Sequence, residues 1–181
     1  MSVVPKIVFF GCVAVVSVAA GTALSKKAYD KRLDRPSSGF TYAVDHFKNE
    51  GIAVLGSQIQ RGSKVVIAAR EITSGSLLEA IRQAKMKGVK IRVLLDGTKN
   101  SVPTRGALGF LRAHGIETRI TQAPMNNQFI LIDSKALFLS SAPWTPDASK
   151  QDGFLHLLAS EIAGIKVQRL FEDAWREARN V

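Results

Sequence analysis

The segment from Met125 to Thr145 groups the polar side chains that a phosphate group could contact. Asp133 and Ser134 separate two short apolar runs, a pattern typical of a tight hairpin turn. Ser140 and Ser141 follow the second run, where hydroxyl or backbone N–H groups can bind an anion. A phosphate-handling hairpin would also need a nucleophile and a cation. The residues directly before the first run, 125–128, include neither a histidine nor a lysine. The segment therefore resembles an active site that has lost its reactive groups.

The elements that position this segment follow from the hydrophobic pattern. Short β-branched or apolar runs bounded by turn residues predict strands, and apolar residues at helical spacing predict helices. The first helix should begin at a Thr73 or Ser74 cap and bury Leu77, Leu78, Ile81 and Ala84. The last should turn Ile165, Leu170, Phe171 and Trp175 inward. We expect strands at Val65–Ala69, Lys90–Asp96, Glu117–Thr121, Phe129–Ile132, Ala136–Leu139 and Phe154–Ala159, and helices at Gly75–Met86, Thr104–Ala113 and Ile162–Arg179.

This alternation of strands and helices resembles the phospholipase D superfamily, in particular its small single-motif members of the Nuc and mitochondrial membrane-anchored types. The resemblance covers roughly residues 41–179. It rests on Val66–Ser74 as a first core strand and turn, on IRQAKMKGVKIRVLLD from Ile81 to Asp96, and on the closing LFEDAWREA. The predicted fold is therefore a phospholipase-D-like α/β/α sandwich with a mixed, mostly parallel sheet.

The signature of that family is His-x-Lys, an Asp five residues after the Lys, then Gly-Ser and an Asn two residues beyond. In this chain the positions fall on Asn126, Gln128, Asp133, Ser140–Ser141 and Pro143. The resemblance implies that two such motifs meet in a homodimer or in one longer chain. One His then attacks phosphorus, the other protonates the leaving oxygen, and the Lys neutralises charge. Asn126 can do neither task of a His, and Gln128 carries no charge, so the predicted motif is degenerate.

Three histidines lie elsewhere in the chain, at positions 46, 114 and 156. His46 lies near the start of the domain, and His114 lies at a helix end. His156 lies on a predicted strand whose family counterpart approaches the active site, so it is the one candidate nucleophile; a structural histidine is the alternative. Asp133 has two interpretations as well, a turn residue or a surviving orienting group. We therefore predict no catalytic residue, and a possible anion or phospholipid site at Asn126, Gln128, Asp133 and Ser141.

The amino-terminal segment predicts attachment to a membrane. Ile7–Leu24 has 18 residues without a charge, which as a helix would span about 27 Å. One lysine precedes this run and five basic residues follow it, a bias that favours a retained single-pass anchor with the domain on the basic side. A cleaved signal peptide ending near Gly21–Ala23 is the alternative. The predicted organisation is an anchor at 1–24, a basic linker at 25–40 and the domain at 41–181.

Composition limits the remaining options. The chain has 181 residues, 46% of them hydrophobic, and a net charge of +10, which suits a globular domain that meets anionic partners. The single Cys12 excludes an intrachain disulfide, and no Cys/His cluster predicts a metal or another cofactor. The basic residues lack the aromatic interleaving of a nucleic-acid-binding module.

Two classes of function follow from these patterns. The first is a membrane-anchored pseudoenzyme with a structural, assembly or anion-binding role, as a homodimer or as an accessory subunit of a membrane complex. The second is a working phosphodiesterase, either an endonuclease or a phospholipid hydrolase, with an unorthodox nucleophile. A mitochondrial membrane is the favoured location, and a bacterial inner membrane is the alternative.

Overall fold

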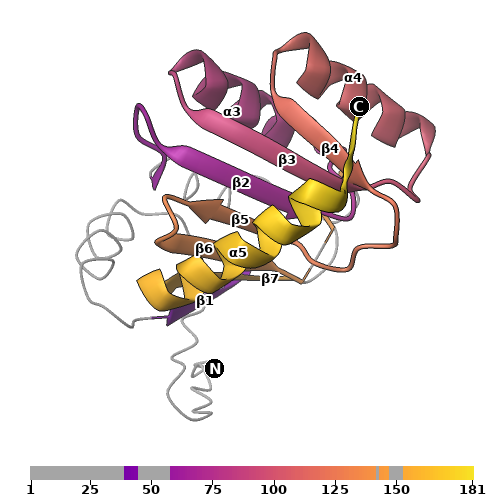
Figure 1. The fold of residues 1–181 in the computed structure, drawn as a ribbon. Coiled ribbons are helices and arrows are strands. Elements are labelled where there is room, and N and C mark those ends of the chain that lie inside the picture. Colours follow the sequence, from indigo (N-terminus) through magenta and orange to yellow (C-terminus); the bar gives the residue numbers. More distant parts are fainter. Residues whose placement is uncertain (1–38, 45–57, 142, 147–152) are drawn as a thin grey trace, which may run out of the picture.

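The structure, a computed structural model, describes residues 39–44, 58–141, 143–146 and 153–181, with the backbone alone at 39–44 and 153–156. Its strands form one eight-stranded sheet in the order β1-β7-β6-β5-β2-β3-β4-β8 (Figure 1). The strands are β1 (Gly39–Val44), β2 (Lys64–Ala69), β3 (Lys90–Asp96), β4 (Glu117–Thr121), β5 (Phe129–Ile132), β6 (Ala136–Ser140), β7 (Gly153–Ala159) and β8 (Arg179–Asn180).

The sheet is mixed, as predicted, but the expectation of a mostly parallel sheet is wrong. Only the pairs β2–β3 and β3–β4 are parallel, and the other five pairs are antiparallel. Parallel neighbours need a crossover connection, and a helix supplies it between β2 and β3 and again between β3 and β4. The two strands joined by the short hairpin at Asp133–Ser134 pair antiparallel, because a two-residue turn reverses the chain. The strands at both edges of the sheet also pair antiparallel with their neighbours.

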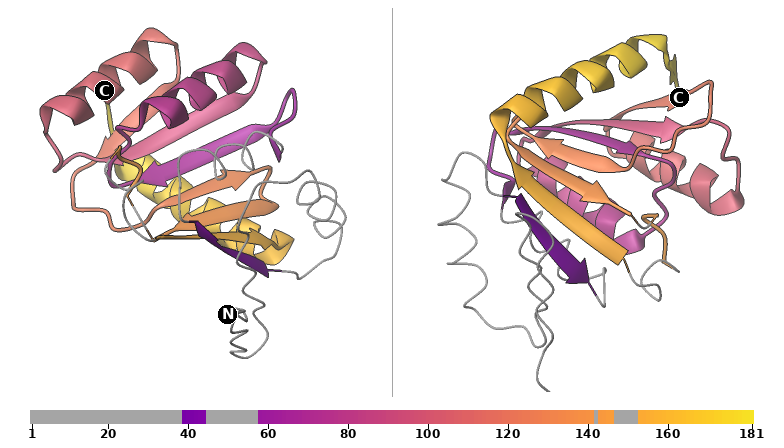
Figure 2. Two further views of the ribbon diagram at one scale, coloured as in Figure 1. Left: turned by 180° about the vertical axis from the view of Figure 1, so that it is seen from behind. Right: turned by 90° about the horizontal axis from the view of Figure 1, so that it is seen from below.

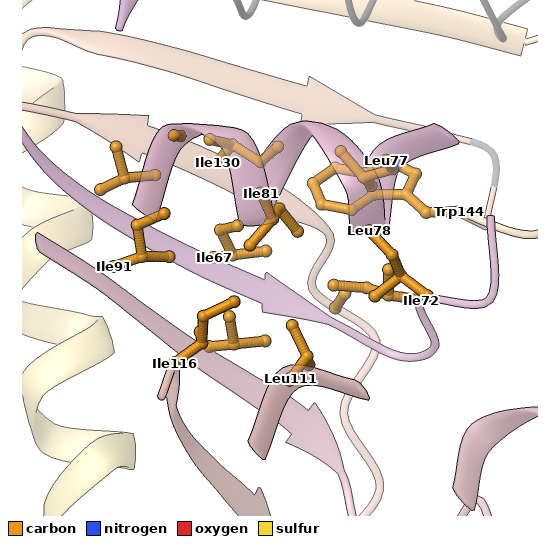
Figure 3. Packing of buried hydrophobic residues seen from close by; sticks show 14 of the residues in the cluster. Ile67, Ile72, Leu77, Leu78, Ile81, Ile91, Leu111, Ile116, Ile130 and Trp144 are labelled. Carbon is orange, nitrogen blue, oxygen red and sulfur yellow. The ribbon is translucent and has the colours of Figure 1, made fainter. Parts of the chain in front are cut away.

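Helices cover both faces of the sheet. The helices α3 (Gly75–Met86) and α4 (Val102–Ala113) lie on one face, and α5 (Glu161–Glu177) crosses the other (Figure 2). Two hydrophobic cores result. The larger one packs Ile67, Leu77, Ile81 and Leu111 under α3 and α4 (Figure 3), and the smaller one packs Phe171 and Trp175 of α5 against the opposite face. Because both faces are covered, β2 and β3 are almost continuously apolar.

The bounds of α3, β3, β4 and β5 are those predicted, and Leu77, Leu78, Ile81 and Ala84 are buried. The expectation for the closing helix is partly wrong: Phe171 and Trp175 face inward, but Ile165 is 42% and Leu170 is 67% exposed. The chain turns at Ala178 and adds β8 to the sheet instead of continuing the helix to Arg179. A helix that crosses a sheet buries only a narrow stripe, so apolar residues beside the stripe stay in solvent.

Several predictions concern residues outside the described part of the chain. The anchor at 1–24, most of the linker at 25–40, and His46 belong to this group. The sheet begins at Gly39, two residues before the predicted start of the domain. Among the described residues, the helices are too short or too polar to cross a bilayer.

Candidate functional site

Asn126 and Gln128, the predicted motif positions, lie at the end of the sheet where β2 and β3 finish. The chain enters β5 there, antiparallel to β2, with Phe129 opposite Ala68. Asn126 is exposed, whereas Gln128 is partly buried. The carbonyl of Gln128 accepts a hydrogen bond from the backbone N–H of Ser140 at 3.1 Å, so the first and second halves of the motif meet at this end. We call it the motif end.

The Gln128 side chain cannot replace a lysine at this position. Its Oε1 atom is buried and has no hydrogen-bond partner in the described part of the chain. An unpaired buried acceptor lowers stability, typically by about 1–3 kcal/mol. Gln128 therefore brings no positive charge to a bound anion. Its Oε1 atom can only accept hydrogen bonds, so it cannot bind an anion either.

Asp96 holds the motif segment in place, a role that the sequence did not reveal. It is buried at the end of β3. One carboxylate oxygen accepts bonds from Thr98 N at 2.8 Å and Thr98 Oγ1 at 2.6 Å, and the other accepts from Met125 N at 3.1 Å. Burial by itself would raise the pKa of Asp96, but the hydrogen bonds from Thr98 and Met125 outweigh burial and lower that pKa. The sequence signal for this role was a carboxylate at the end of an apolar strand.

The tail after β6 is fixed against the start of α3. Ser141 is exposed, and Trp144 is buried and pairs with Ile72 in an isolated bridge. The Trp144 carbonyl accepts bonds from Thr73 N at 2.9 Å and Ser74 N at 3.0 Å. These two N–H groups are therefore engaged by protein and are not free to bind an anion. Ser74 is the N-cap residue, as predicted, although its side chain makes no capping bond.

Asp133 lies at the opposite end of the sheet from Asn126 and Gln128. The four residues of β5 separate it from Gln128, a span of roughly 16 Å at the rise of an extended strand. Its carboxylate accepts bonds from Ser63 Oγ at 2.9 Å and Lys64 N at 2.8 Å. The structure therefore supports the turn interpretation of Asp133 and does not bring this residue to the motif end.

The histidines do not assemble a replacement site in the described region. The backbone of His156 pairs with Leu139 on β6 and with Thr41 on β1, but its side chain is outside the described atoms, so its role stays a prediction. His114 is exposed at the end of α4, with Nδ1 2.8 Å from the Phe110 carbonyl. Metal-type clusters of three or more His, Cys, Asp or Glu residues do not occur among the described residues.

The comparison with protein families settles the family. Residues 55–175 match the model described as "Cardiolipin synthase, PLD-like domain". The chain belongs to the phospholipase-D-like family. No curated protein sequence matches the chain. The matched residues extend from before β2 into the last turns of α5, so the phospholipase-D-like domain includes the whole motif segment.

Solved structures agree with this fold. A phospholipase D family member, Nuc from Salmonella typhimurium, has a TM-score of 0.70 and 18% identity, with 80% of this chain and 98% of Nuc covered. NucT from Helicobacter pylori also gives 0.70 and 18%, with 80% and 99% covered. Phosphatidylserine synthase from Haemophilus influenzae gives 0.55 and 12%, with 86% and 45% covered. At these identities the likeness is one of fold.

Proposed function

We propose that this chain is a membrane-anchored phospholipase-D-like pseudoenzyme with a structural, assembly or anion-binding role. The observation that carries the proposal is the pair Asn126 and Gln128, at the His and Lys positions of the motif, within a domain that has kept the family fold. A carboxamide has no nucleophilic lone pair and does not titrate near neutral pH. Loss of one group that stabilises transition-state charge typically lowers a rate by about 10²–10³.

The contacts of the motif segment support this proposal. The Trp144 carbonyl engages the N–H groups of Thr73 and Ser74, and Asp133 stabilises a turn at the far end of β5. Asp133 and Trp144 thus have structural contacts that explain their presence without catalysis. A weak phosphodiester or phospholipid-headgroup site at Asn126, Gln128 and Ser141 is the binding version of the proposal.

The membrane part of the proposal rests on the sequence. The apolar run Ile7–Leu24 and the basic residues after it would hold the domain on the basic side of a bilayer, with a mitochondrial membrane favoured. The partner would be a second copy of the chain or a larger membrane complex. Purification from native membranes in mild detergent, followed by mass measurement, distinguishes a free dimer from a subunit of a complex.

The decisive experiment is a turnover assay on the full chain in neutral detergent. A chromogenic phosphodiester, single-stranded DNA and cardiolipin serve as substrates, and wild type is compared with His156→Ala and Ser141→Ala. We expect the same background rate for all three proteins. Turnover by wild type that either substitution abolishes, or a phosphorylated side chain trapped with substrate, would establish the alternative function of an active phosphodiesterase.

A further inference from the structure

The end of the sheet opposite the motif carries an open cleft with many basic residues. Its volume is about 920 Å³, and its lining residues come from the starts of β2 and β3, the end of α3 and the middle of α5. We call it the basic cleft. The ionisable residues that line it are Lys64, Lys85, Lys90, Arg92, Glu117, Asp133 and Glu172.

The negative charges of the basic cleft are mostly engaged by protein. Arg92 and Glu172 form a two-bond ion pair, which raises the pKa of Arg92 and lowers that of Glu172. The guanidinium of Arg92 also lies over the Phe171 ring at 5.2 Å from its centre. The carboxylate of Asp133 is bound to Ser63 and to the backbone of Lys64. Glu117 also lines the cleft, where its charge contributes to the raised pKa of Arg92.

Three lysines remain whose ammonium groups make no hydrogen bond or ion pair within the described residues: Lys64, Lys85 and Lys90. The backbone holds two of them in fixed positions, since Lys64 O accepts from Asp133 N at 2.9 Å and Lys90 N donates to Ser63 O at 2.9 Å. Further exposed basic residues occupy the loops at this end, namely Arg61, Lys87 and Lys135, and the nearby acid is Glu161 at the start of α5. The lining and these neighbours together hold seven basic and four acidic residues, so this end carries a net charge of +3.

The chain enters the sheet at this same end. One row of paired residues crosses the sheet from the first residue of β1 to the basic cleft: Gly39, Leu158, Leu137, Leu131, Val66, Arg92 and Glu117. At about 4.8 Å between strands, Gly39 lies roughly 24 Å from Arg92. In the view of Figure 1 the turns that precede β2 and β3, and the head of the β5 arrow, lie together on the left.

We propose that the basic cleft and the lysines around it are the face that docks on the anionic surface of a bilayer. The segment before Gly39 contains the predicted linker and the apolar run, so a bilayer that holds this run lies within reach of the end where β1 begins. A linker of residues 25–38 spans at most about 50 Å, which brings the domain near the surface but does not orient it. The unpaired lysines supply the orientation, and the motif end then faces away from the lipid.

The inference rests on the proposed membrane attachment and is independent of whether the motif is catalytic. It is tested with the full chain carrying Cys12→Ala and one new cysteine, at Met86→Cys beside the basic cleft or at Ala123→Cys at the motif end. Met86 is exposed in the last turn of α3, and Ala123 is exposed after β4. Each cysteine carries a fluorophore, and the vesicles contain a lipid with a quencher on its headgroup.

In vesicles of equimolar phosphatidylcholine and phosphatidylglycerol, we expect strong quenching at position 86 and little at position 123. In phosphatidylcholine alone both should be weak. Each lysine close to an anionic leaflet strengthens docking about fivefold, so Lys64→Gln, Lys85→Gln and Lys90→Gln together should shift the docking equilibrium roughly a hundredfold. The matched control is Arg70→Gln, Arg105→Gln and Arg179→Gln, which removes the same charge from exposed positions outside the cleft lining and should leave quenching unchanged.

Equal quenching at both positions, or quenching that survives removal of the three cleft lysines, would overturn the docking proposal. The proposal would also be overturned if the three lysines bound a single-stranded oligonucleotide and their removal left lipid quenching unchanged. Failure of the chain to float with phosphatidylcholine vesicles would remove only the anchor from the proposed function. In that case docking still requires salt-sensitive flotation with the anionic vesicles that the three lysine substitutions abolish, and its absence refutes docking.

Discussion

At Asp133 the backbone adopts φ of 51°, and Ser134 follows with φ of 55°. Two successive residues in this left-handed region are typical of the two-residue turn that matches the twist of a hairpin. Aspartate tolerates this conformation better than most residues, because its short carboxylate can bond nearby backbone groups. Asp133 therefore has a structural reason to occupy this turn that does not depend on catalysis.

Replacing Asp133 separates this structural role from a catalytic one. Asp133→Ala removes the acceptor of Ser63 Oγ and Lys64 N and places alanine in the left-handed region. We expect a loss of about 1–2 kcal/mol in the free energy of unfolding. Asp133→Asn keeps an acceptor and the backbone preference and should lose less than half of that amount. Urea titration monitored by circular dichroism measures both, and equal losses for the two variants would contradict the turn interpretation.

Asp96 should make stability depend on pH at the acid end. The pKa of its carboxyl is lowered in the folded chain, so its contribution is complete above the ordinary carboxyl pKa of about 4. The contribution is lost as pH falls through the lower folded value. Asp96→Asn should cost about 2 kcal/mol near neutral pH, and the difference from wild type should shrink below about pH 4. A difference between the two proteins that stays constant down to about pH 2 would show that the carboxylate charge is not involved.

At the level of elements, the seating of α5 on the hairpin depends on one glycine. Gly164 is buried, and a Cβ atom added there would lie 1.9 Å from the Ser134 carbonyl oxygen and 2.5 Å from its carbon. Both are backbone atoms of the β5–β6 turn, so they cannot move aside as a flexible side chain would. The first turn of α5 thus rests directly on the turn that Asp133 begins, and the position of one fixes the position of the other.

Gly164→Ala should therefore displace α5 and destabilise the fold by about 3 kcal/mol. The matched control is Gly106→Ala in α4, where an added Cβ meets nothing within 4 Å. Removal of a glycine from an open helix position should stabilise the chain by about 0.5–1 kcal/mol. Thermal melts of both variants compare the two effects, and a Gly164→Ala melt at or above the wild-type temperature would contradict the close approach.

At the scale of the whole molecule, the sheet has two ends with different chemistry. The motif end holds Asn126, Gln128 and the tail that contains Trp144, and the opposite end holds the basic cleft and the start of β1. A domain that docks by the cleft would present its motif end to solvent or to a partner. The two ends can consequently be altered independently, because substitutions far apart in a rigid domain are usually additive.

The retained fold predicts that the chemistry can be partly restored. Asn126→His combined with Gln128→Lys returns a nucleophile and a cation to the start of β5, beside Ser140. We expect the double variant to hydrolyse a chromogenic phosphodiester at least about tenfold faster than wild type, while each single variant stays at background. A folded double variant that hydrolyses the phosphodiester no faster than wild type would contradict the view that the site is inactive because of these two residues. In that case Pro143→Asn would be the next change to add.

The sequence alone was sufficient for most of the elements. Apolar runs and glycines at the helix ends predicted α3, β3, β4 and β5 with the observed bounds, since periodicity and turn chemistry are local properties. The assignment of Asn126, Gln128 and Asp133 to motif positions also rests on spacing and stays a prediction. Family membership, expected from the same segments, is confirmed by the family match.

Only the tertiary structure decided which of these residues come together. Tertiary packing gave Asp133 its bonds to Ser63 and Lys64, gave Asp96 its bond to Met125, and left Ile165 and Leu170 of α5 in solvent. It also gathered Lys64, Lys85 and Lys90 from three separate elements around one cleft. Contacts between distant segments depend on register and on the direction in which each strand runs, and no local pattern of residues encodes either.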